Sequence, residues 1–218
     1  MFEYKAIVLK QSIPHDLFEK LKEETQKKFA PKNNQLAGQI RREETLGHLI
    51  PDVEPFIANE IQNYDTYVTK VIPSFLRRMI LDRTQGGEKN PLKIKLRLLE
   101  LWVNHMKQYE FNPIHSHDGL FSFVMFIKVP FLIEGMHKMA PGSKSPTNAA
   151  GSLTFFHPGN PFQDSFYREE IFYPDKTWEG KILIFPAYLC HQVQPFYGTE
   201  EERITISGNV YADTLVER

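Results

Sequence analysis

The segment Asn112-Pro-Ile-His-Ser-His-Asp-Gly119 places two histidines, His115 and His117, two positions apart. A third histidine, His191, ends the later segment Gly180-Lys-Ile-Leu-Ile-Phe-Pro-Ala-Tyr-Leu-Cys-His191. Because alternate side chains of a strand share one face, His115 and His117 point to the same side, and His191 can join them from a distant strand. Three protein ligands leave a coordination position open, as a catalytic metal requires. The spacing therefore predicts a metal site.

Asp118 leaves a second ligand set open. A carboxylate often completes a three-ligand iron site together with two histidines. In a regular strand Asp118 points away from His117, and only a bulge or turn at Asp118-Gly119 would bring it to the same side. We therefore expect His117 to be the ligand and keep Asp118 as the alternative. If His117 is the ligand, Asp118 forms the turn or accepts a hydrogen bond from an imidazole.

Arg203 follows His191 by twelve residues and begins a predicted strand. Alternation places Arg203 and Thr205 on one polar face of this strand, opposite isoleucines. A guanidinium donates two parallel hydrogen bonds to a carboxylate, and the Thr205 hydroxyl can donate a third. The pattern predicts that Arg203 and Thr205 bind a carboxylate whose other end reaches the metal. The alternative is an exposed ion pair between Arg203 and one of the glutamates at 200–202.

The composition is that of a globular chain with one sizeable core. Of its 218 residues, 41% are hydrophobic and 13% aromatic, and β-barrels of roughly 200–250 residues commonly form one domain. We expect a single domain over residues 1–218, with a strand and supporting helices in 1–91 and the β core in 92–212. The 26 basic and 27 acidic residues give a net charge of −1, so neither nucleic acid nor an anionic membrane is an expected partner.

The sequence carries no sign of a membrane span or a secretory signal. Its apolar runs fall short of the roughly 20 residues that cross a bilayer, and Met1-Phe-Glu-Tyr-Lys5 lacks a basic start followed by an apolar stretch. The single cysteine, Cys190, excludes an internal disulfide, fits a reducing compartment and is expected to be buried. We expect a cytoplasmic protein.

Two amphipathic helices are predicted in the first part of the chain. The first helix follows a short strand over 1–10, starts near Ser12 with a proline in its first turn, and ends near Pro31. The second carries apolar residues at helical spacing over 57–71 and is interrupted at Pro73. Both helices are expected to support a sheet.

From residue 92 the hydrophobic period changes from helical to alternating, which is typical of half-exposed strands. Short strands separated by glycine, proline and asparagine favour a jelly roll, mainly β with flanking α-helices. The segment 134–151 lacks apolar periodicity and is expected to be a long loop near a site mouth. Strands are predicted over 92–98, 121–129, 152–156, 181–185, 189–194 and 203–210.

These motifs resemble those of the iron(II)- and 2-oxoglutarate-dependent oxygenases, which are built on a double-stranded β-helix. That family shows a His-x-Asp/Glu pair, a distal histidine and, shortly after it, a basic residue that is often part of Arg-x-Ser. Here His115 matches the first position and His117 the acidic position, while His191 matches the distal histidine. Arg203 with Thr205 matches the cosubstrate clamp. The His-x-His variant is similar to a subgroup of these oxygenases from bacteria and bacterial viruses (bacteriophages).

The resemblance covers residues 100–210 and implies Fe(II) and 2-oxoglutarate as cofactors. It implies His115, His117 and His191 as catalytic metal ligands, O2 as a partner, and hydroxylation of a small molecule or protein side chain with release of succinate and CO2. If the gene is viral, the location is the host cytoplasm. Because one fold hosts many reactions, neither the substrate nor the oligomeric state follows. On position alone, four further side chains are expected in the pocket: Trp102, Asn104, Phe126 and Tyr188.

Two other functions stay open on the sequence. His-x-His also occurs in cupin-type metal dioxygenases and isomerases, which do not use 2-oxoglutarate. In cupins three or four residues separate the second histidine from a glutamate, and here Phe121 and Ser122 occupy the corresponding positions. A non-enzymatic jelly-roll binding module would hold a structural ion in a closed four-ligand site, or no ion. The position of Arg203 relative to His191 favours the oxygenase over both.

Overall fold

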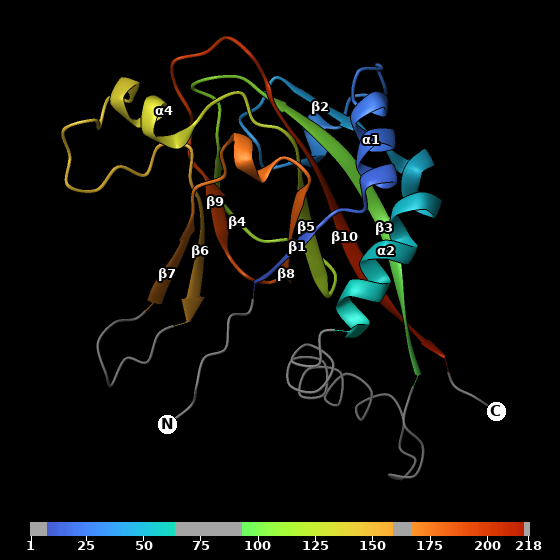
Figure 1. The fold of residues 1–218 in the computed structure, drawn as a ribbon. Helices are drawn as coiled ribbons and strands as arrows, with labels where there is room; N and C mark the ends of the chain where they lie inside the picture. Colours follow the sequence, from blue (N-terminus) through green and yellow to red (C-terminus); the bar gives the residue numbers. More distant parts are fainter. Residues whose placement is uncertain (1–7, 64–92, 159–166, 216–218) are drawn as a thin grey trace.

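The computed structural model describes residues 8–63, 93–158 and 167–215 (Figure 1). The helices within them are α1 (His15–Glu24), α2 (Ile50–Asn63) and α4 (Ile133–Met139), with short 3-10 helices η1 (Asn33–Gln35), η2 (Gly47–Leu49) and η4 (Lys176–Trp178). The strands are β1 (Leu9–Ser12), β2 (Arg42–Thr45), β3 (Lys93–Met106), β4 (Asn112–His115), β5 (Phe121–Lys128), β6 (Leu153–Pro158), β7 (Tyr167–Phe172), β8 (Lys181–Pro186), β9 (His191–Val193) and β10 (Arg203–Leu215).

The strands form two antiparallel sheets. The major sheet has six strands in the order β1-β8-β5-β10-β3-β2, and the minor sheet has four in the order β4-β9-β6-β7. From β3 onward the chain passes back and forth between the two sheets, so that each sheet contains strands from both ends of this region. This winding is a double-stranded β-helix, and the expected jelly roll with flanking helices is confirmed.

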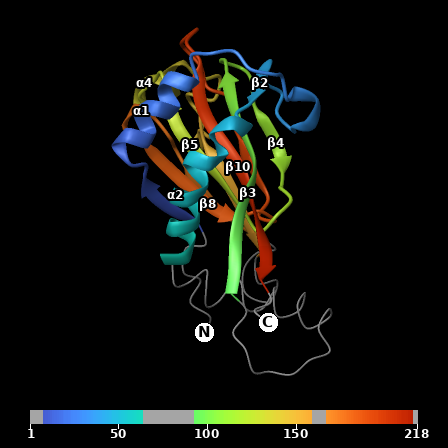
Figure 2. The ribbon, with the colours of Figure 1, turned by 90° about the vertical axis from the view of Figure 1, so that its right-hand side faces the viewer.

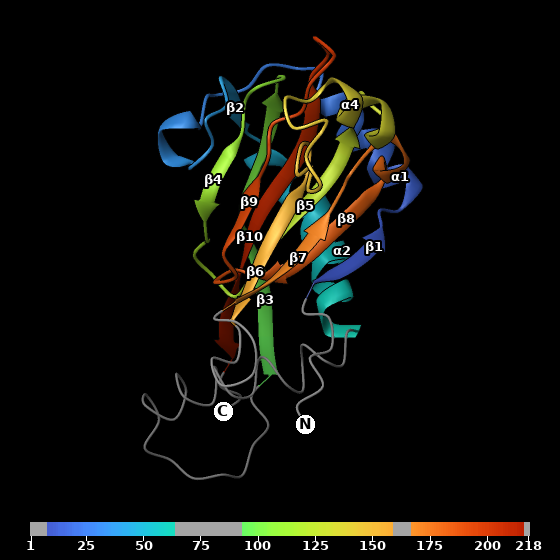
Figure 3. The ribbon, with the colours of Figure 1, turned by 90° about the vertical axis from the view of Figure 1, so that its left-hand side faces the viewer.

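The molecule has three layers. Helices α1 and α2 cover the outer face of the major sheet (Figure 2), and the minor sheet lies on its opposite side (Figure 3). One hydrophobic cluster fills the space between the helices and the major sheet, and a second lies between the sheets. Strand β5 serves both clusters, because Phe123 and Met125 belong to the first and Phe126 belongs to the second.

A bulge in β3 sets which side chains face the space between the sheets. Asn209 lies opposite Glu100 and Val210 opposite Leu98, so Leu99 is the extra residue, and it is 57% exposed. Without the bulge, strict alternation would place the residues beyond it on the wrong faces. With it, the helix side of β3 is apolar on both sides of the bulge, through Leu96, Leu98, Leu101 and Val103.

The secondary structure differs from the sequence prediction in several places. Strand β3 continues well past the predicted 92–98 because the bulge interrupts its simple alternation. Strands β2 and β7 were not predicted, since charged residues interrupt their apolar alternation. Strand β4 ends at His115, so His117, which was expected to share a strand with His115, lies in the connection that follows. Helix α2 starts before the predicted 57–71 and contains Pro55, whereas the part of that range after residue 63 lies outside the described residues, as do residues 1–7 of the first predicted strand.

The segment predicted as a long loop, 134–151, is a loop only in part. Its beginning belongs to α4, in which Met136 is buried and Met139 is 65% exposed. At its end, Gly151 has a φ of +73°, and a Cβ there would meet Met136 Cε at 2.5 Å. A side chain at position 151 would therefore be strained, and the end of the Met136 side chain would have to shift to make room for it. None of the described helices is long and apolar enough to cross a membrane.

We expect Gly208→Ala to lower the free energy of unfolding by about 1–3 kcal/mol through overpacking. A Cβ at Gly208 would lie 2.6 Å from the Glu100 carbonyl oxygen and 2.7 Å from Phe123 Cζ. The matched control is Gly135→Ala in α4, where a Cβ would meet nothing within 4 Å, and it should stabilise the helix by about 0.5–1 kcal/mol. Urea unfolding checks both; equal stability of the two variants would contradict the packing described for β10.

Candidate metal and cosubstrate site

Three histidines meet between the two sheets. His115 ends β4 and lies directly opposite His191, which begins β9, and His117 follows in the connection to β5. Their candidate ligand nitrogens all lie within 4.8 Å of one another. The His117 backbone N–H donates to the Ala187 carbonyl at 2.8 Å, which holds this connection against the chain that leads to β9. The geometry brings together the three side chains that the sequence predicted as ligands.

The hydrogen bonds of two rings leave the same nitrogen available. His115 Nδ1 lies 2.7 Å from the Pro113 carbonyl oxygen, and His191 Nδ1 lies 2.9 Å from the Leu189 carbonyl oxygen. A carbonyl only accepts, so Nδ1 carries the hydrogen in both rings and Nε2 keeps its lone pair. Metal-bound histidines commonly donate their other ring nitrogen in this way. Both rings are therefore in the tautomer that ligates through Nε2.

Burial keeps the three imidazoles neutral. Burial first, and the neighbouring histidines second, lower the pKa of His191 to about 3 and that of His117 to about 4. Burial also lowers the pKa of His115. Because only the neutral imidazole has a free lone pair, these histidines are ready to ligate at neutral pH. Clustered neutral imidazoles fit a divalent transition metal such as Fe(II).

Asp118 lies outside this cluster. Its side chain is exposed, whereas His117 is partly buried and in ring contact with both other histidines, at centroid distances of 5.0 and 5.1 Å. The turn that follows is set by Gly119, which has a φ of +96° and approaches the Val210 carbonyl too closely for a Cβ. The arrangement favours His117 over Asp118 as the third ligand, and we keep this ligand set as a proposal.

A pocket extends from the histidines between the sheets. Arg203, Thr205 and Ser207 of β10 line it, beside Trp102, Asn104 and Met106 of β3. Phe126 and Phe185 form an apolar wall of the pocket on the major sheet. Ile40 and Asn112 line the side of the pocket near β2 and β4. Of the side chains expected from position alone, Trp102, Asn104 and Phe126 line this pocket, whereas Tyr188 is 58% exposed and is not part of its lining.

Arg203 lines the pocket and is buried, with 3% of the residue exposed. Its Nη1 donates to the Gly151 carbonyl at 3.2 Å, its Nη2 lies 2.8 Å from Met106 Sδ, and the guanidinium is 5.5 Å from the Phe196 ring centre. Among the described residues no carboxylate pairs with it. Burial lowers the pKa of Arg203 to about 10, so the side chain is still a cation at neutral pH.

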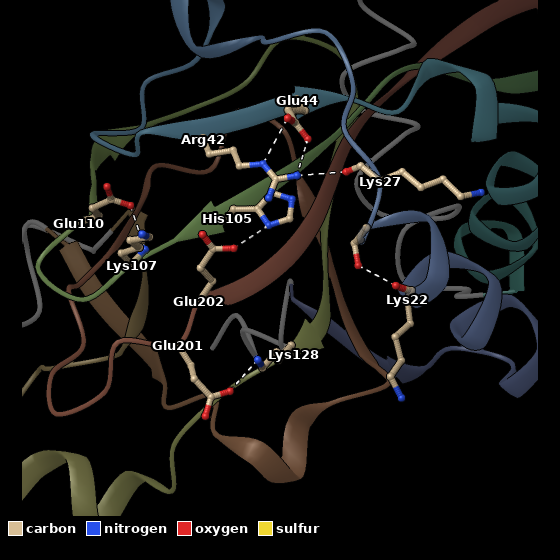
Figure 4. Close-up of polar contacts among 11 residues, drawn as sticks. Lys22, Lys27, Arg42, Glu44, His105, Lys107, Glu110, Lys128, Glu201 and Glu202 are labelled. Carbon is tan, nitrogen blue, oxygen red and sulfur yellow. Dashed lines mark hydrogen bonds and ion pairs between the residues drawn. The ribbon is translucent and has the colours of Figure 1, made fainter.

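The alternative of an exposed ion pair for Arg203 is not what the structure contains. Glu201 pairs with Lys128 at 2.6 Å, and Glu202 pairs with His105 Nδ1 at 3.1 Å (Figure 4). Glu200 accepts a hydrogen bond from the Gln108 side chain. All three glutamates therefore have partners other than Arg203, whose side chain lines the pocket.

A hydrogen-bonded group of polar side chains lies between Arg203 and the histidines. Trp102 Nε1 donates to Asn104 Oδ1 at 3.2 Å, and Asn104 Nδ2 donates to Thr205 Oγ1 at 3.2 Å and to Ser207 Oγ at 3.4 Å. Since Thr205 Oγ1 accepts from Asn104, its own hydrogen is free to donate to a ligand. The role of Asn104 follows from its register opposite Thr205, which sequence alternation alone does not reveal.

Several pocket residues and one surface residue differ from the sequence prediction. Asn112, Met106 and Ile40 line the pocket without having been predicted there. Asn112 could have been noticed, because it precedes the first histidine in the same short segment. Cys190, which was expected to be buried, is exposed, because its neighbour His191 takes the inward position and alternation turns Cys190 outward.

Comparisons with known proteins place the chain in a family. The family model described as "Putative 2OG-Fe(II) oxygenase" matches residues 100–209, just over half of the chain. No curated protein matches. An oxidoreductase of the 2OG-Fe(II) oxygenase family from Burkholderia pseudomallei has a similar solved structure, with 16% identity, a TM-score of 0.37 and 56% of this chain covered. This chain spans 47% of that protein, about half of its length.

Two other solved structures are similar over most of their length. A prolyl-4-hydroxylase from Pseudomonas putida has 13% identity and a TM-score of 0.48, with 92% of this chain and 90% of that chain covered. HygX from Streptomyces hygroscopicus, solved with nickel and 2-oxoglutarate bound, has 11% identity and a TM-score of 0.49, with 94% and 82% covered. The family match carries the assignment: the chain belongs to the 2OG-Fe(II) oxygenase family. It is an enzyme, and its cofactors are Fe(II) and 2-oxoglutarate.

We expect His117→Ala and His191→Ala each to weaken Co(II) or Fe(II) binding by more than about 100-fold, since even outer partners of a ligand are worth roughly 10–100-fold. Asp118→Ala should leave the metal affinity essentially unchanged. His48→Ala is the control, because His48 is an exposed histidine bonded to Glu24 at 3.2 Å. Anaerobic calorimetric titration measures all four variants. Loss of metal binding in Asp118→Ala together with tight binding in His117→Ala would reverse the ligand assignment.

Proposed function

We propose that the protein is an Fe(II)- and 2-oxoglutarate-dependent dioxygenase that hydroxylates an organic substrate, a small molecule or a protein side chain, and releases succinate and CO2. The observation that carries the proposal is a buried cation without a described anionic partner, Arg203, in the same pocket as three neutral imidazoles. A ligand with a carboxylate at one end and metal-binding oxygens at the other satisfies both. 2-Oxoglutarate is such a ligand, and the family uses it.

In this proposal His115, His117 and His191 hold the iron. When bound, Fe(II) and 2-oxoglutarate supply the activation of O2 and the oxidation of a substrate C–H bond. Arg203 binds the distal carboxylate of 2-oxoglutarate through N–H groups that its bonds to Gly151 and Met106 leave available. Thr205 adds a hydroxyl donor that Asn104 orients. Arg203 and Thr205 therefore fix which end of 2-oxoglutarate points away from the histidines.

The apolar walls of the pocket have their own part. Trp102, Phe126 and Phe185 are buried to 3% exposure or less and form much of the lining between the clamp and the histidines. A dry wall strengthens the electrostatic attraction between Arg203 and a carboxylate, because the effective dielectric is lower than in water. It also keeps water away from reactive species, as such oxidations require.

The alternatives from the sequence explain less. A cupin-type metal dioxygenase or isomerase without 2-oxoglutarate has no need of a buried arginine aimed into the metal pocket. A structural site in a non-enzymatic module would need a closed ligand set, and within the described residues the cluster consists of three histidines. A cytoplasmic location, in a bacterium or in the host of a bacterial virus, remains part of the proposal.

We expect Arg203→Met to raise the Kd of the metal-loaded protein for 2-oxoglutarate by about 100-fold or more, since hydrogen bonds to a charged group contribute about 1.5–3 kcal/mol each. Metal affinity should be kept. The melting temperature of the ligand-free variant should stay level or rise, because the change removes a buried cation without a described counter-charge.

Arg41→Met is the matched control, since the Arg41 side chain is 89% exposed, and it should bind 2-oxoglutarate as the unmodified protein does. Calorimetric titration of 2-oxoglutarate under nitrogen and a thermal melt supply the two readouts. Undiminished 2-oxoglutarate binding by Arg203→Met would contradict the proposed clamp. A large drop in its melting temperature would instead indicate that Arg203 stabilises the fold, through contacts such as its bond to the Gly151 carbonyl.

A further inference from the structure

Glu43 is a buried carboxyl group close to the pocket that the proposed reaction does not use. It lies on β2 directly opposite Asn104 of β3, and 1% of the residue is exposed. Its Oε2 accepts from Asn33 Nδ2 at 3.3 Å, while its Oε1 is sealed from solvent and has no hydrogen-bond partner. No described lysine or arginine forms an ion pair with it. A buried carboxyl in this position calls for a donor.

A second sealed acceptor lies in the same small space. Asn112 Oδ1, from the start of β4, is also buried without a partner. Both atoms approach Gly38: a Cβ built there would lie 2.5 Å from Glu43 Oε1 and 3.0 Å from Asn112 Oδ1. Only a residue without a side chain leaves room at position 38 for this arrangement.

An ionised carboxylate and an amide oxygen can both only accept, so neither could satisfy the other. A proton on Glu43 Oε1 would turn it into a donor toward Asn112 Oδ1 and would serve both atoms. Burial, and secondarily the negative charge of Glu110, raises the pKa of Glu43 to about 7, which is compatible with the acid form at neutral pH.

The other end of the Asn112 amide is open to the pocket. Asn112 lines the same pocket as Arg203 and His115. Its Nδ2 is not among the sealed atoms, and it has no hydrogen-bond partner among the described residues. If Oδ1 is held by Glu43, the two N–H groups of this amide face ligand space as donors.

We propose that Glu43 is a positioning residue: its carboxylic acid donates to Asn112 Oδ1 and thereby holds the Asn112 amide with its N–H groups toward the pocket, where they donate to an oxygen of 2-oxoglutarate. Asn112 is then a cosubstrate-binding residue, placed on the side of the pocket that faces β4. The inference rests on the proposed function, since it takes 2-oxoglutarate as the ligand.

The arrangement makes cosubstrate binding depend on pH. When Glu43 loses its proton it becomes an acceptor, which favours the flipped amide and turns the Asn112 oxygen toward the anionic ligand. The surrounding charges come from several elements. Glu110 accepts from the Arg41 backbone N–H and from the Lys107 backbone N–H, and His115 follows on β4. Arg42 and Glu44 pair with each other on β2; Figure 4 shows this pair and the contact between Lys107 and Glu110.

The first test uses metal-free protein and compares Glu43→Gln with the unmodified chain. A carboxyl whose pKa is raised in the folded state binds more protons folded than unfolded, so its contribution to stability is lost as pH rises from its unfolded pKa through about 7. The melting temperature of the unmodified protein should therefore fall, relative to Glu43→Gln, between about pH 5 and about pH 8.5. The infrared band of a protonated carboxylic acid at about pH 5.5 should be absent from the variant. The proposal would be overturned if the melting temperatures of both proteins changed with pH in the same way and the unmodified protein lacked the carboxylic acid band.

The second test measures 2-oxoglutarate affinity of metal-loaded protein under nitrogen. Glu43→Gln keeps a donor and should bind 2-oxoglutarate with an affinity that no longer weakens above about pH 7, unlike the unmodified protein. Glu43→Met has no donor and should bind about tenfold more weakly at about pH 6, as one lost hydrogen bond to a charged ligand implies. Asn112→Leu should weaken 2-oxoglutarate binding to the same extent. The double variant Glu43→Met/Asn112→Leu should bind no more weakly than either single variant, because the two residues act as one unit.

The outcomes separate the inference from the function on which it rests. If the metal-loaded unmodified protein does not bind 2-oxoglutarate at any pH, the proposed function fails. If it binds and Glu43→Met binds as tightly, or if Glu43→Gln loses as much as Glu43→Met, the proposed function stands and the role of Glu43 is refuted. Rescue by glutamine but not by methionine supports it, since a merely space-filling role would not distinguish the two.

Discussion

The organisation of this protein depends on one buried charge. Arg203 carries its guanidinium into the space between the sheets, where no described carboxylate neutralises it. A buried cation without a partner is costly, so folding leaves part of the free energy of this site to be recovered when an anion binds. The same cost gives selectivity, because a ligand without a carboxylate at that end would leave the charge unpaired.

The fold turns this constraint into a site by giving each strand two different faces. The bulge at Leu99 keeps one side of β3 apolar for the helices while Trp102, Asn104 and Met106 face the pocket. The pairing of β4 with β9 brings His115 opposite His191. The polar clamp of Arg203 and Thr205, the apolar walls and the neutral imidazoles therefore line a single pocket, as a ligand with two different ends requires.

Much of this arrangement was predictable from local patterns, and the rest depended on contacts across the sheets. Alternation along a strand was enough to place Arg203 with Thr205. The same rule suggested the three histidines, although His117 lies after the end of β4, in the connection to β5. The partners of Asn104 and the meeting of Glu43 with Asn112 come from strand register and from Gly38, which no local pattern specifies. Two predictions were wrong: 134–151 is not a loop throughout, since it begins within α4, and Cys190 is exposed because it alternates with the inward-facing His191. That residues 1–218 form a single domain stays a prediction.

The most direct test of the account is spectroscopic. Metal-free protein is mixed with Fe(II) under nitrogen and then with 2-oxoglutarate, and the visible absorption is recorded after each addition. The account predicts a charge-transfer band that appears only when both are present, because the pocket holds the cosubstrate against the iron. Iron that binds without producing this band on addition of 2-oxoglutarate would contradict it and would favour a metal site of another kind.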